Sequence, residues 1–594
     1  MRRLTRHATV NREFLEIEWG AACRRPLLLW IYIQHTLTFA YFALLGAMHL
    51  SLDVGMRIAM HSYAPGPSGV LLIATGVLHL SPFVPARLWP RRCRCNSRRY
   101  WPRLPINVEI AANHFVAISC ETYTAYDMSC TIVTAELAGL YAALLALNCL
   151  CTTWLLFLRH AASKIVWVSI VDSAISFLLS AGFPLFFLLV PLLHFMFTSS
   201  KDISHSLRWF AEIYSTSRAL SVSSLGGLFL RMLPGVTNYV VLRRVTVSLG
   251  RQRRRGPVTP EVGKKAFTTQ QRYGRVLKGV LIINVLWGLA VVAASTRATY
   301  HRATCPAYCV YASAPWFNTN CNCIYALVNC ANLGIVGTTI DSYFDASVLG
   351  PNLVFLHVER CDVSSGLAAT TITAFQLLYA LQLESTNLTH WDVEGSELQS
   401  SIKVISIRGS RLEQVPRILA PAPPGVRWIF IVDSLLTYIP TSAWESWTSL
   451  LSLWLGDNGL TNIPAIVWEN MTSLQILALN NNALSTIPEA ELSRLPQLHT
   501  LHLHNNQLVT FPATLLAAHP TLQITLNHNP IASIESLYPN AQVASTLWCK
   551  SQPVSDVCYA DCAETCGRPV VGNYLCDLSC NTTTCQYDEG DCIY

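Results

Sequence analysis

Charged residues are scarce in this 594-residue chain. Asp, Glu, Lys and Arg together make up 13% of the residues, whereas hydrophobic residues make up 52%. An ordinary soluble protein has about twice that share of charged residues, so the composition excludes a chain that is soluble throughout. The chain is long enough for several domains.

The short motifs that carry common enzymatic chemistry are also missing. The chain contains no kinase glycine-rich loop, no Walker A sequence, no HExxH zinc motif and no GxSxG nucleophile elbow. The segments expected to be cytoplasmic are too short for a catalytic domain. We therefore predict that the protein is not an enzyme.

The charge that is present is divided between the two halves of the chain. Residues 1–294 hold 31 Lys/Arg and 12 Asp/Glu, a net charge of +19, whereas residues 295–594 hold 11 and 23, a net charge of −12. The basic half is typical of a membrane domain with positive cytoplasmic loops, and the acidic half of a water-soluble ectodomain. The arginines flank apolar runs, so nucleic acid binding is a poor interpretation.

Five apolar runs are expected to cross a membrane, because a spanning helix needs roughly 20 mainly apolar residues. The expected spans are 27–50, 131–158, 165–195, 220–242 and 277–294, within a membrane domain over residues 27–294. The first run is too long for the apolar region of a cleaved signal peptide, so we expect it to remain as an anchor.

The orientation of the chain in the membrane follows from the loop 243–276, which carries ten basic residues and one acidic residue, Glu261. Such a loop should be cytoplasmic. With five spans, the basic N-terminus (1–26) and the link 159–164 are cytoplasmic as well, whereas four spans would put both outside. Five spans leave the arginines of 91–99 in an outer loop, 51–130, against the charge rule. The loop 243–276 is also a candidate site for anionic lipid head groups.

Two charges, Asp172 and Arg231, fall inside predicted spans. They favour an ion or proton path only if more polar groups accompany them, and the alternative is helix packing or snorkelling. Because we expect few intramembrane polar groups, a channel, transporter or membrane enzyme with an accessory ectodomain is the second hypothesis.

The acidic half is periodic. The pattern L-x-x-L-x-L-x-x-N-x-L recurs about every 24 residues, in eight copies within residues 353–545. The best copies begin at Leu450, Leu474 and Leu498, and an Ile-Pro or Phe-Pro pair follows four of the copies. This pattern resembles extracellular leucine-rich repeats, which implies an α/β solenoid with one short parallel strand per repeat. The ninth position needs a small polar side chain to bond the backbone of the turn.

The outward strand positions of such a solenoid line its concave face. Here they include the aromatic residues Trp428, Phe430 and Trp454, which we select as the candidate ligand-binding surface. Four histidines share this face, His499, His502, His504 and His528. They could bind metal or sense pH, but we expect them to decorate the strands only, because no ligand spacing accompanies them.

Most cysteines lie in two clusters of the acidic half, residues 305–361 and 549–592, which indicates a disulfide framework outside the cytosol. Residues 305–352 resemble the N-terminal cysteine cap of leucine-rich repeats, and residues 546–561 part of a C-terminal cap. Three Asn-x-Ser/Thr sequons, at Asn387, Asn470 and Asn581, agree with an extracellular location.

The segment 562–592 carries six cysteines, at positions 562, 566, 576, 580, 585 and 592, and is too short for a hydrophobic core. It resembles a Notch-type repeat (LNR), a small calcium-binding module. The resemblance implies the bridges Cys562–Cys585, Cys566–Cys580 and Cys576–Cys592. It also implies calcium ligands at Asn573, Asp588 and Asp591, whereas a fourth ligand position of the family is occupied by Val570. The alternative is a disulfide knot that folds without metal.

The sequence thus predicts three parts: an α-helical multi-span membrane domain, an α/β leucine-rich repeat solenoid and a small disulfide-rich calcium-binding module. We expect a receptor-like or adhesion-like protein of the plasma membrane whose C-terminal half is extracellular. Its solenoid would bind a protein or glycan ligand. A third hypothesis is a purely structural role as a scaffold.

Overall fold

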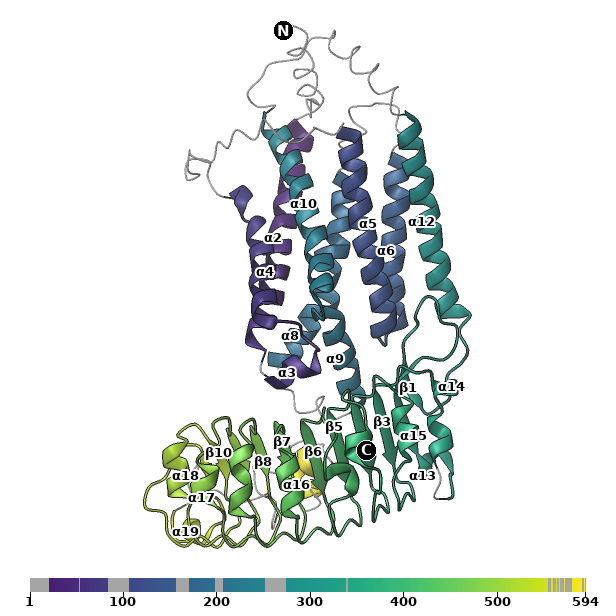
Figure 1. The fold of residues 1–594 in the computed structure, drawn as a ribbon. Helices are drawn as coiled ribbons and strands as arrows, with labels where there is room; N and C mark the ends of the chain where they lie inside the picture. The colour runs from purple at the N-terminus through teal and green to yellow at the C-terminus, as the bar shows by residue number, and fades with distance from the viewer. Residues whose placement is uncertain are drawn as a thin grey trace. The chain divides into compact units, whose positions relative to one another are not determined.

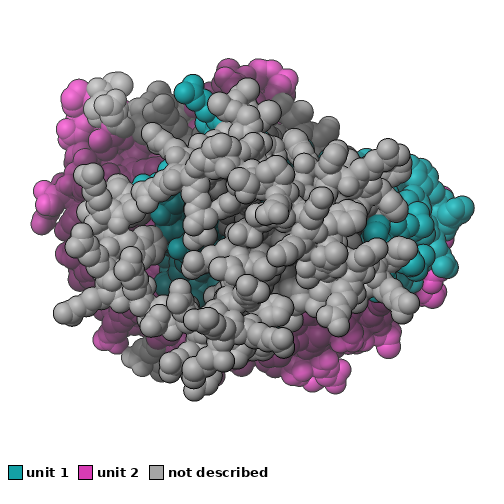
Figure 2. Space-filling model, turned by 90° about the horizontal axis from the view of Figure 1, so that it is seen from above, with its two compact units in different colours: residues 1–198, 213–302, 313–319 teal, residues 199–212, 303–312, 320–594 magenta. Residues whose placement is uncertain are grey.

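The computed structural model describes residues 21–52, 54–83, 106–155, 170–197, 207–251, 274–337 and 340–553, together with residues 557–558, 562–563, 566, 571, 580–589 and 592. The chain divides into two compact units, which are coloured in Figure 2. The first comprises residues 1–198, 213–302 and 313–319 and is mainly helical. The second comprises residues 199–212, 303–312 and 320–594 and contains the sheet.

Long helices dominate the first unit (Figure 1). They are α2 (Ala21–Ser51), α4 (Pro65–Leu78), α5 (Ile106–Thr131), α6 (Ala135–Leu155), the helix Ile170–Leu193, α10 (Leu225–Arg251) and α12 (Gly274–Tyr300), with the shorter helices α3 (Val54–Ala59) and α8 (Val190–Phe197). Another short helix, α9 (Leu207–Leu220), has its first residues assigned to the second unit and the rest to the first. Five segments within them are long and apolar enough to cross a membrane: Arg25–Ser51, Pro65–Phe83, Ile170–Leu193, Leu225–Arg243 and Gly279–Tyr300.

This set of helices differs from the predicted spans in two places. Pro65–Phe83 is not among the predicted spans, because its glycines and prolines dilute the apolar run. The predicted span 131–158 does not begin where a helix begins, because α5 ends at Thr131 and the chain turns before α6 starts at Ala135. Helix α6 has a shorter apolar stretch, Ala135–Cys151, and α5 is an additional helix of 26 residues whose Glu121 and Asp127 conceal it in the sequence.

Helices α2 and α4 pack closely through small residues. A Cβ atom added to Gly46 would lie 2.6 Å from the Ile73 side chain and 2.7 Å from the carbonyl oxygen of Gly69, and one added to Gly69 would lie 2.8 Å from the carbonyl oxygen of Gly46. Small residues allow this close approach, which is how helices gain packing energy in a lipid environment. The glycines that weaken the apolar signal of α4 therefore hold it against α2.

The expectation of few intramembrane polar groups is wrong. Many polar side chains are buried in the helical unit, among them Gln34, His35, His79, His114, Glu121, Asn148, Asp172, Ser173, Ser176 and Asn238. They escape notice in the sequence because most lie singly within apolar runs. Asp172 pairs with His114, at 2.5 Å between Oδ1 and Nδ1. Arg231 donates to the carbonyl oxygens of Ala219 and Ser221, at 2.7 and 3.1 Å.

An eleven-stranded sheet organises the second unit (Figure 1). Its strands are β1 (Cys309–Ala312), β2 (Cys323–Asn329), β3 (Phe355–Glu359), β4 (Ala380–Glu384), β5 (Val404–Arg408), β6 (Trp428–Val432), β7 (Ser452–Trp454), β8 (Ile476–Ala478), β9 (Thr500–His502), β10 (Gln523–Thr525) and β11 (Ala541–Gln542). Strand β1 is antiparallel to β2, and the others are parallel in chain order. Each of the eight predicted repeats contributes one strand, from β3 to β10.

Asparagine side chains connect the turns that follow the strands. The Nδ2 atom of Asn482 donates to the carbonyl oxygens of Leu455, Leu479 and Asn480, at 2.9, 3.1 and 3.0 Å. Asn458, Asn506 and Asn529 make the same set of bonds in their own repeats. In an earlier repeat Thr386 has this position, and its Oγ1 is buried and has no hydrogen-bond partner among the residues that the structure describes. Hydroxyl side chains therefore replace asparagine only in part, as their shorter reach predicts.

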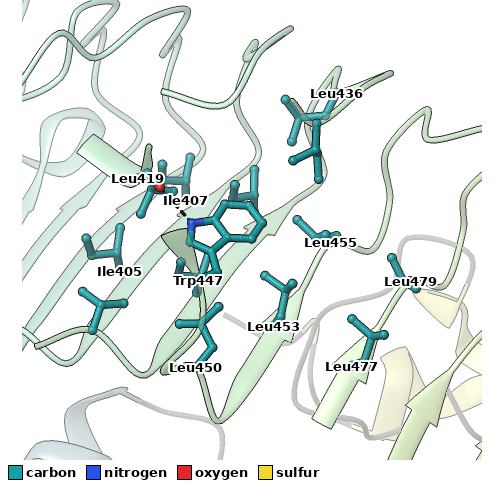
Figure 3. Close-up of a cluster of buried hydrophobic side chains, with 14 of the residues drawn as sticks. Ile405, Ile407, Leu419, Leu436, Trp447, Leu450, Leu453, Leu455, Leu477 and Leu479 are labelled. Atoms are coloured by element: carbon teal, nitrogen blue, oxygen red, sulfur yellow. Dashed lines mark hydrogen bonds between the residues drawn. The ribbon is translucent and has the colours of Figure 1, made fainter. Parts of the chain in front are cut away.

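Short helices cover the side of the sheet opposite the concave face, and the Pro of each Ile-Pro or Phe-Pro pair precedes one. Pro440, Pro464, Pro488 and Pro512 are the N-cap residues of α16 (Thr441–Ser446), η11 (Ala465–Asn470), α17 (Glu489–Leu492) and α18 (Ala513–Ala518). Between these helices and the sheet lies the core, where leucines and isoleucines of successive strands meet buried tryptophans (Figure 3). Trp447 is 1% exposed, and its Nε1 donates to the carbonyl oxygen of Leu419 at 2.8 Å.

Disulfides close both ends of the solenoid. At the N-terminal end the bonds are Cys305–Cys321, Cys309–Cys323 and Cys330–Cys361, and at the C-terminal end Cys549–Cys558. The terminal repeats have no neighbour to cover their apolar side, so a covalent cap replaces part of that packing.

Candidate ligand-binding surface

The three selected aromatic residues lie on adjacent strands of the sheet. Trp428 and Phe430 belong to β6 and Trp454 to β7, where Phe430 is paired in register with Trp454. All three side chains are partly exposed, because they alternate with the fully buried Ile429 and Leu453. The 24-residue period therefore places them on the concave face, as a strand periodicity of two requires.

Phe430 and Trp454 form the centre of a row of stacked side chains. Their ring centroids are 5.8 Å apart with planes inclined by 26°. On one side the Arg408 guanidinium lies over the Phe430 ring at 5.5 Å, and on the other the Trp454 ring lies 5.6 Å from that of His502, across the small Ala478. We call Arg408, Phe430, Trp454 and His502 the stacked row. Its members support one another, so its exposed edges form a preordered surface.

A largely buried hydrogen-bonded group lies on the earlier strands, between the stacked row and the N-terminal cap. The hydroxyl of Tyr325 lies 3.1 Å from His357 Nδ1, and His357 Nε2 lies 3.2 Å from a carboxylate oxygen of Glu384. The other neighbours of Glu384 are Gln382, which donates to it at 2.9 Å, and Arg408. Burial alone would raise the pKa of Glu384, but the bond to His357 and the nearby positive charges lower it to about 2.

Two of the histidines near the C-terminal end of the face, His502 and His504, are held by burial toward the neutral form. Burial lowers the pKa of His502 to about 4, and burial together with the neighbouring histidines lowers that of His504 to about 3. Within the described part of the chain, side chains gather closely enough for a metal only at two cysteine clusters, around Cys305 and Cys562, and these cysteines are disulfide-bonded. The arrangement gives no support to a histidine metal site.

The C-terminal module is described in part. It contains the bonds Cys562–Cys585 and Cys566–Cys580, and Cys592 is also disulfide-bonded. The expected partner Cys576 and the expected calcium ligands Asn573 and Asp591 lie outside the described residues.

Asp588 is the expected calcium ligand that the structure describes. It is fully buried, and it ends a left-handed run of three residues, Gln586, Tyr587 and Asp588, that begins next to Cys585. A left-handed conformation is costly for residues other than glycine, so the bridges and the packing around them must impose it. A buried carboxylate on such a constrained turn fits a hard cation such as calcium.

The three sequon asparagines, Asn387, Asn470 and Asn581, are all exposed. Asn387 donates from Nδ2 to Asp362 at 3.1 Å, a surface bond that a glycan would replace. The basic loop 243–276, selected as a lipid site, lies largely outside the described residues, which include only its two ends in α10 and α12.

The residues that flank the aromatic pair are not among the site residues predicted from the sequence. His357 has the same register position on its strand as Phe430 and Trp454 have on theirs, and Glu384 and Arg408 have the position two residues later, so the repeat register could have found them. The polar residues inside the helical unit carried no such signal.

Comparison with known protein families identifies two regions of the chain. Residues 448–508 match the leucine-rich repeat model, and residues 559–593 match the LNR domain model. No curated protein sequence matches the chain.

Solved structures with similarity include a leucine-rich repeat protein of Leptospira interrogans, with 21% identity and a TM-score of 0.30, covering 36% of this chain and 58% of that one. Another is a TLR13–ssRNA13 complex, with 13% identity and a TM-score of 0.32, covering 44% of this chain and 33% of that one. The match thus spans less than two thirds of either structure. The chain carries leucine-rich repeats and an LNR domain, together with several helices long and apolar enough to span a membrane.

Proposed function

We propose that this protein is a multi-pass membrane protein that binds an extracellular protein or glycan through the concave face of its solenoid. The observation that carries the proposal is the stacked row: four side chains from strands β5, β6, β7 and β9 lie in contact and remain partly exposed. Aromatic and arginine side chains that are already ordered lose little entropy on binding, so they make efficient anchors. The proposed role is binding and not catalysis.

The proposed topology has seven crossings, in place of the five predicted. Helices α2 and α4 run in opposite directions along one another, and α5 and α6 do likewise (Figure 1). Counting α4 and α5 as crossings puts the segment 84–105, with its arginines at 91–99, on the same side as the N-terminus and the basic loop 243–276. All three basic segments then obey the positive-inside rule, and the solenoid is still extracellular because seven is odd like five. The plasma membrane is the proposed location.

Calcium is proposed as a ligand of the LNR module, held by Asp588, Asn573 and Asp591. When bound, it would supply positive charge that holds these oxygen atoms together and braces the module. The buried position of Asp588 supports this proposal.

The concave face is tested by replacing its aromatic side chains in the full-length chain. The triple variant Trp428→Ala, Phe430→Ala and Trp454→Ala is compared with the wild type, in lipid nanodiscs, on arrays of glycans and of purified extracellular proteins. We expect each ligand captured by the wild type to lose at least about tenfold in affinity, as for removal of an interface anchor.

The control is Tyr438→Ala, which removes a side chain that is 57% exposed and lies after β6, outside the concave face. It should bind as the wild type does. If the triple variant folds and binds every captured ligand unchanged, the assignment of the concave face is wrong.

A further inference from the structure

A carboxyl group that has no cationic partner among the described residues is buried in the helical unit. Glu121 on α5 is 1% exposed. Asn148 on α6 is one of its polar neighbours, and its Nδ2 donates to Glu121 Oε2 at 3.5 Å and to Ser176 Oγ, on the helix Ile170–Leu193, at 3.4 Å. These bonds are long, so three helices place polar groups around the carboxyl without binding it tightly.

Part of this cluster has unused hydrogen-bonding capacity. In the described part of the chain, Glu121 Oε1 and His114 Nε2 are both buried and have no hydrogen-bond partner. His114 lies two helical turns before Glu121 on α5, and its other ring nitrogen faces Asp172. Burying a polar atom without a partner costs free energy, so an atom or ion bound at Glu121 Oε1 would stabilise the folded protein.

The charges in the cluster do not balance. Asp172 acts electrostatically on Glu121, and the other titratable groups near it are Tyr141 and Cys149 on α6 and Cys120 on α5. On α10, Arg231 acts on Asp127, farther along α5. Asp172 has His114 as a close basic neighbour, whereas an ionised Glu121 would be an uncompensated charge among the described residues, which is costly in a medium of low dielectric constant. One monovalent positive charge at Glu121 would remove that cost.

The helix that contributes Ser176 and Asp172 is irregular directly beyond the cluster. It adopts π-helical geometry over η4 (Leu178–Gly182) and η5 (Pro184–Leu189). Stretches of this kind are rare and are frequent at functional sites, because they shift side chains out of the α-helical register. This is a second observation, independent of charge, that sets the region apart from a packed helix interface.

We propose that the helical unit binds one monovalent cation, a proton or a metal ion such as Na⁺, at the carboxyl group of Glu121. The hydroxyl of Ser176 and the side-chain amide of Asn148 are its supporting polar groups. The site is separate from the concave face, so the protein would have a cation-dependent membrane unit in addition to a ligand-binding solenoid.

The experiment uses the purified full-length chain in lipid nanodiscs. Infrared difference spectra at neutral pH detect the C=O stretch of a protonated carboxyl, and thermal unfolding is followed in NaCl and in choline chloride. The variant is Glu121→Gln, which keeps the shape of the side chain and removes its titration. The control is Glu136→Gln, an exposed glutamate in the first turn of α6.

Two results support the proposal and distinguish the two ions. A bound proton gives a carboxyl band in the wild type that is absent in Glu121→Gln and present in Glu136→Gln. A bound Na⁺ gives no such band, but NaCl raises the unfolding temperature of the wild type and of the control above its value in choline chloride, and does not do so in Glu121→Gln.

The proposal is overturned if the wild type shows neither the band nor stabilisation by Na⁺, or if both are unchanged in Glu121→Gln. If Glu121→Gln does not fold, Ser176→Ala takes its place. Loss of the hydroxyl should then shift the frequency of the band or abolish the Na⁺ effect, and an unaltered wild-type response would overturn the proposal.

Discussion

Single positions decide much of the stability of the solenoid, because each is repeated along the sheet. One residue after each strand from β3 to β10 adopts a left-handed conformation, from Arg360 in the first repeat to His528 in the last. In the middle repeats this residue is Asp433, Asp457, Asn481 or Asn505. Asp and Asn tolerate this conformation better than other residues with a side chain. Hydrogen bonds also connect these side chains from one repeat to the next, since Asn505 donates to Asn481 and Asn481 donates to Asp457.

The charge of Asp457 in this row makes the stability of the solenoid depend on pH. Burial, followed by the charge of Asp433, raises the pKa of Asp457 from 3.8 to about 6, although the bond from Asn481 acts against this. The folded-state pKa thus lies above the unfolded value. The folded state is therefore favoured by this group below a pH of about 4, and the benefit is lost as the pH rises through about 6.

Asp457→Asn should remove this dependence, because the amide is never charged and still accepts the bond from Asn481. We expect the variant to be more stable than the wild type at neutral pH, on the order of 2 kcal/mol, and equal to it at low pH. Unfolding temperatures measured across this pH range check it. A constant difference between the two proteins at all pH values would contradict the proposed role of the charge.

The asparagine that bridges the turns is a second residue with a large expected effect. In Asn506→Ala, the carbonyl oxygens of Leu479, Leu503 and His504 and the amide of Leu484 lose their partner. Leaving such buried groups unpaired should lower the free energy of unfolding by about 2–4 kcal/mol. Gln507→Ala, at the exposed neighbouring position, should change it little. Chemical denaturation followed by tryptophan fluorescence measures both, and equal effects would argue against the bridging role.

At the scale of elements, packing through glycine determines which weakly hydrophobic segments join the helical unit. Gly69→Leu would place a side chain where Gly46 and Leu50 of α2 already lie within 2.8 Å of a Cβ atom. Because the neighbouring atoms include backbone, α2 and α4 must separate, and we expect a loss of stability of about 1–3 kcal/mol or more.

The matched control is Gly139→Leu on α6, where nothing lies within 4 Å of an added Cβ atom. Thermal unfolding in detergent compares the two. If Gly139→Leu is as damaging as Gly69→Leu, the effect comes from helix propensity or hydrophobicity and not from the α2–α4 contact.

For the whole molecule, the number of crossings decides which segments share a side of the membrane. Translation in microsomes should add glycans at Asn387, Asn470 and Asn581, and removing each sequon singly should remove one glycan, because all three asparagines are exposed and extracellular in the proposed topology. A chain that is unglycosylated and digested from the cytosolic side in this half would overturn that topology.

The same assay separates seven crossings from five. Arg98→Thr completes a sequon at Asn96, within residues 84–105. With seven crossings this site faces the cytosol and stays unmodified, whereas with five crossings it lies in the outer loop and gains a glycan. A fourth glycan on the Arg98→Thr chain would therefore restore the five-span interpretation.

The sequence by itself determined the repeats and the LNR domain. Their signals are local. A leucine pattern repeated every 24 residues can be recognised without the fold, because each repeat uses the same positions for the same contacts, and so can six cysteines at the spacing of a family. The register of Phe430 beside Trp454 followed from this period. Which aromatic rings actually stack, and that Arg408 and His502 complete the row, depended on rotamers that only the folded sheet shows.

The helical unit was decided by tertiary structure. Hydropathy identifies a helix by its own composition. It therefore does not explain the glycines of α4, which only α2 explains, and it does not select α5, whose polar residues are explained only by partners on other helices. Glu121, Asn148 and Ser176 are separated by 27 and 28 residues and have no common motif. Their proximity exists only after the helices pack, because a buried polar group finds its partners in space and not along the chain.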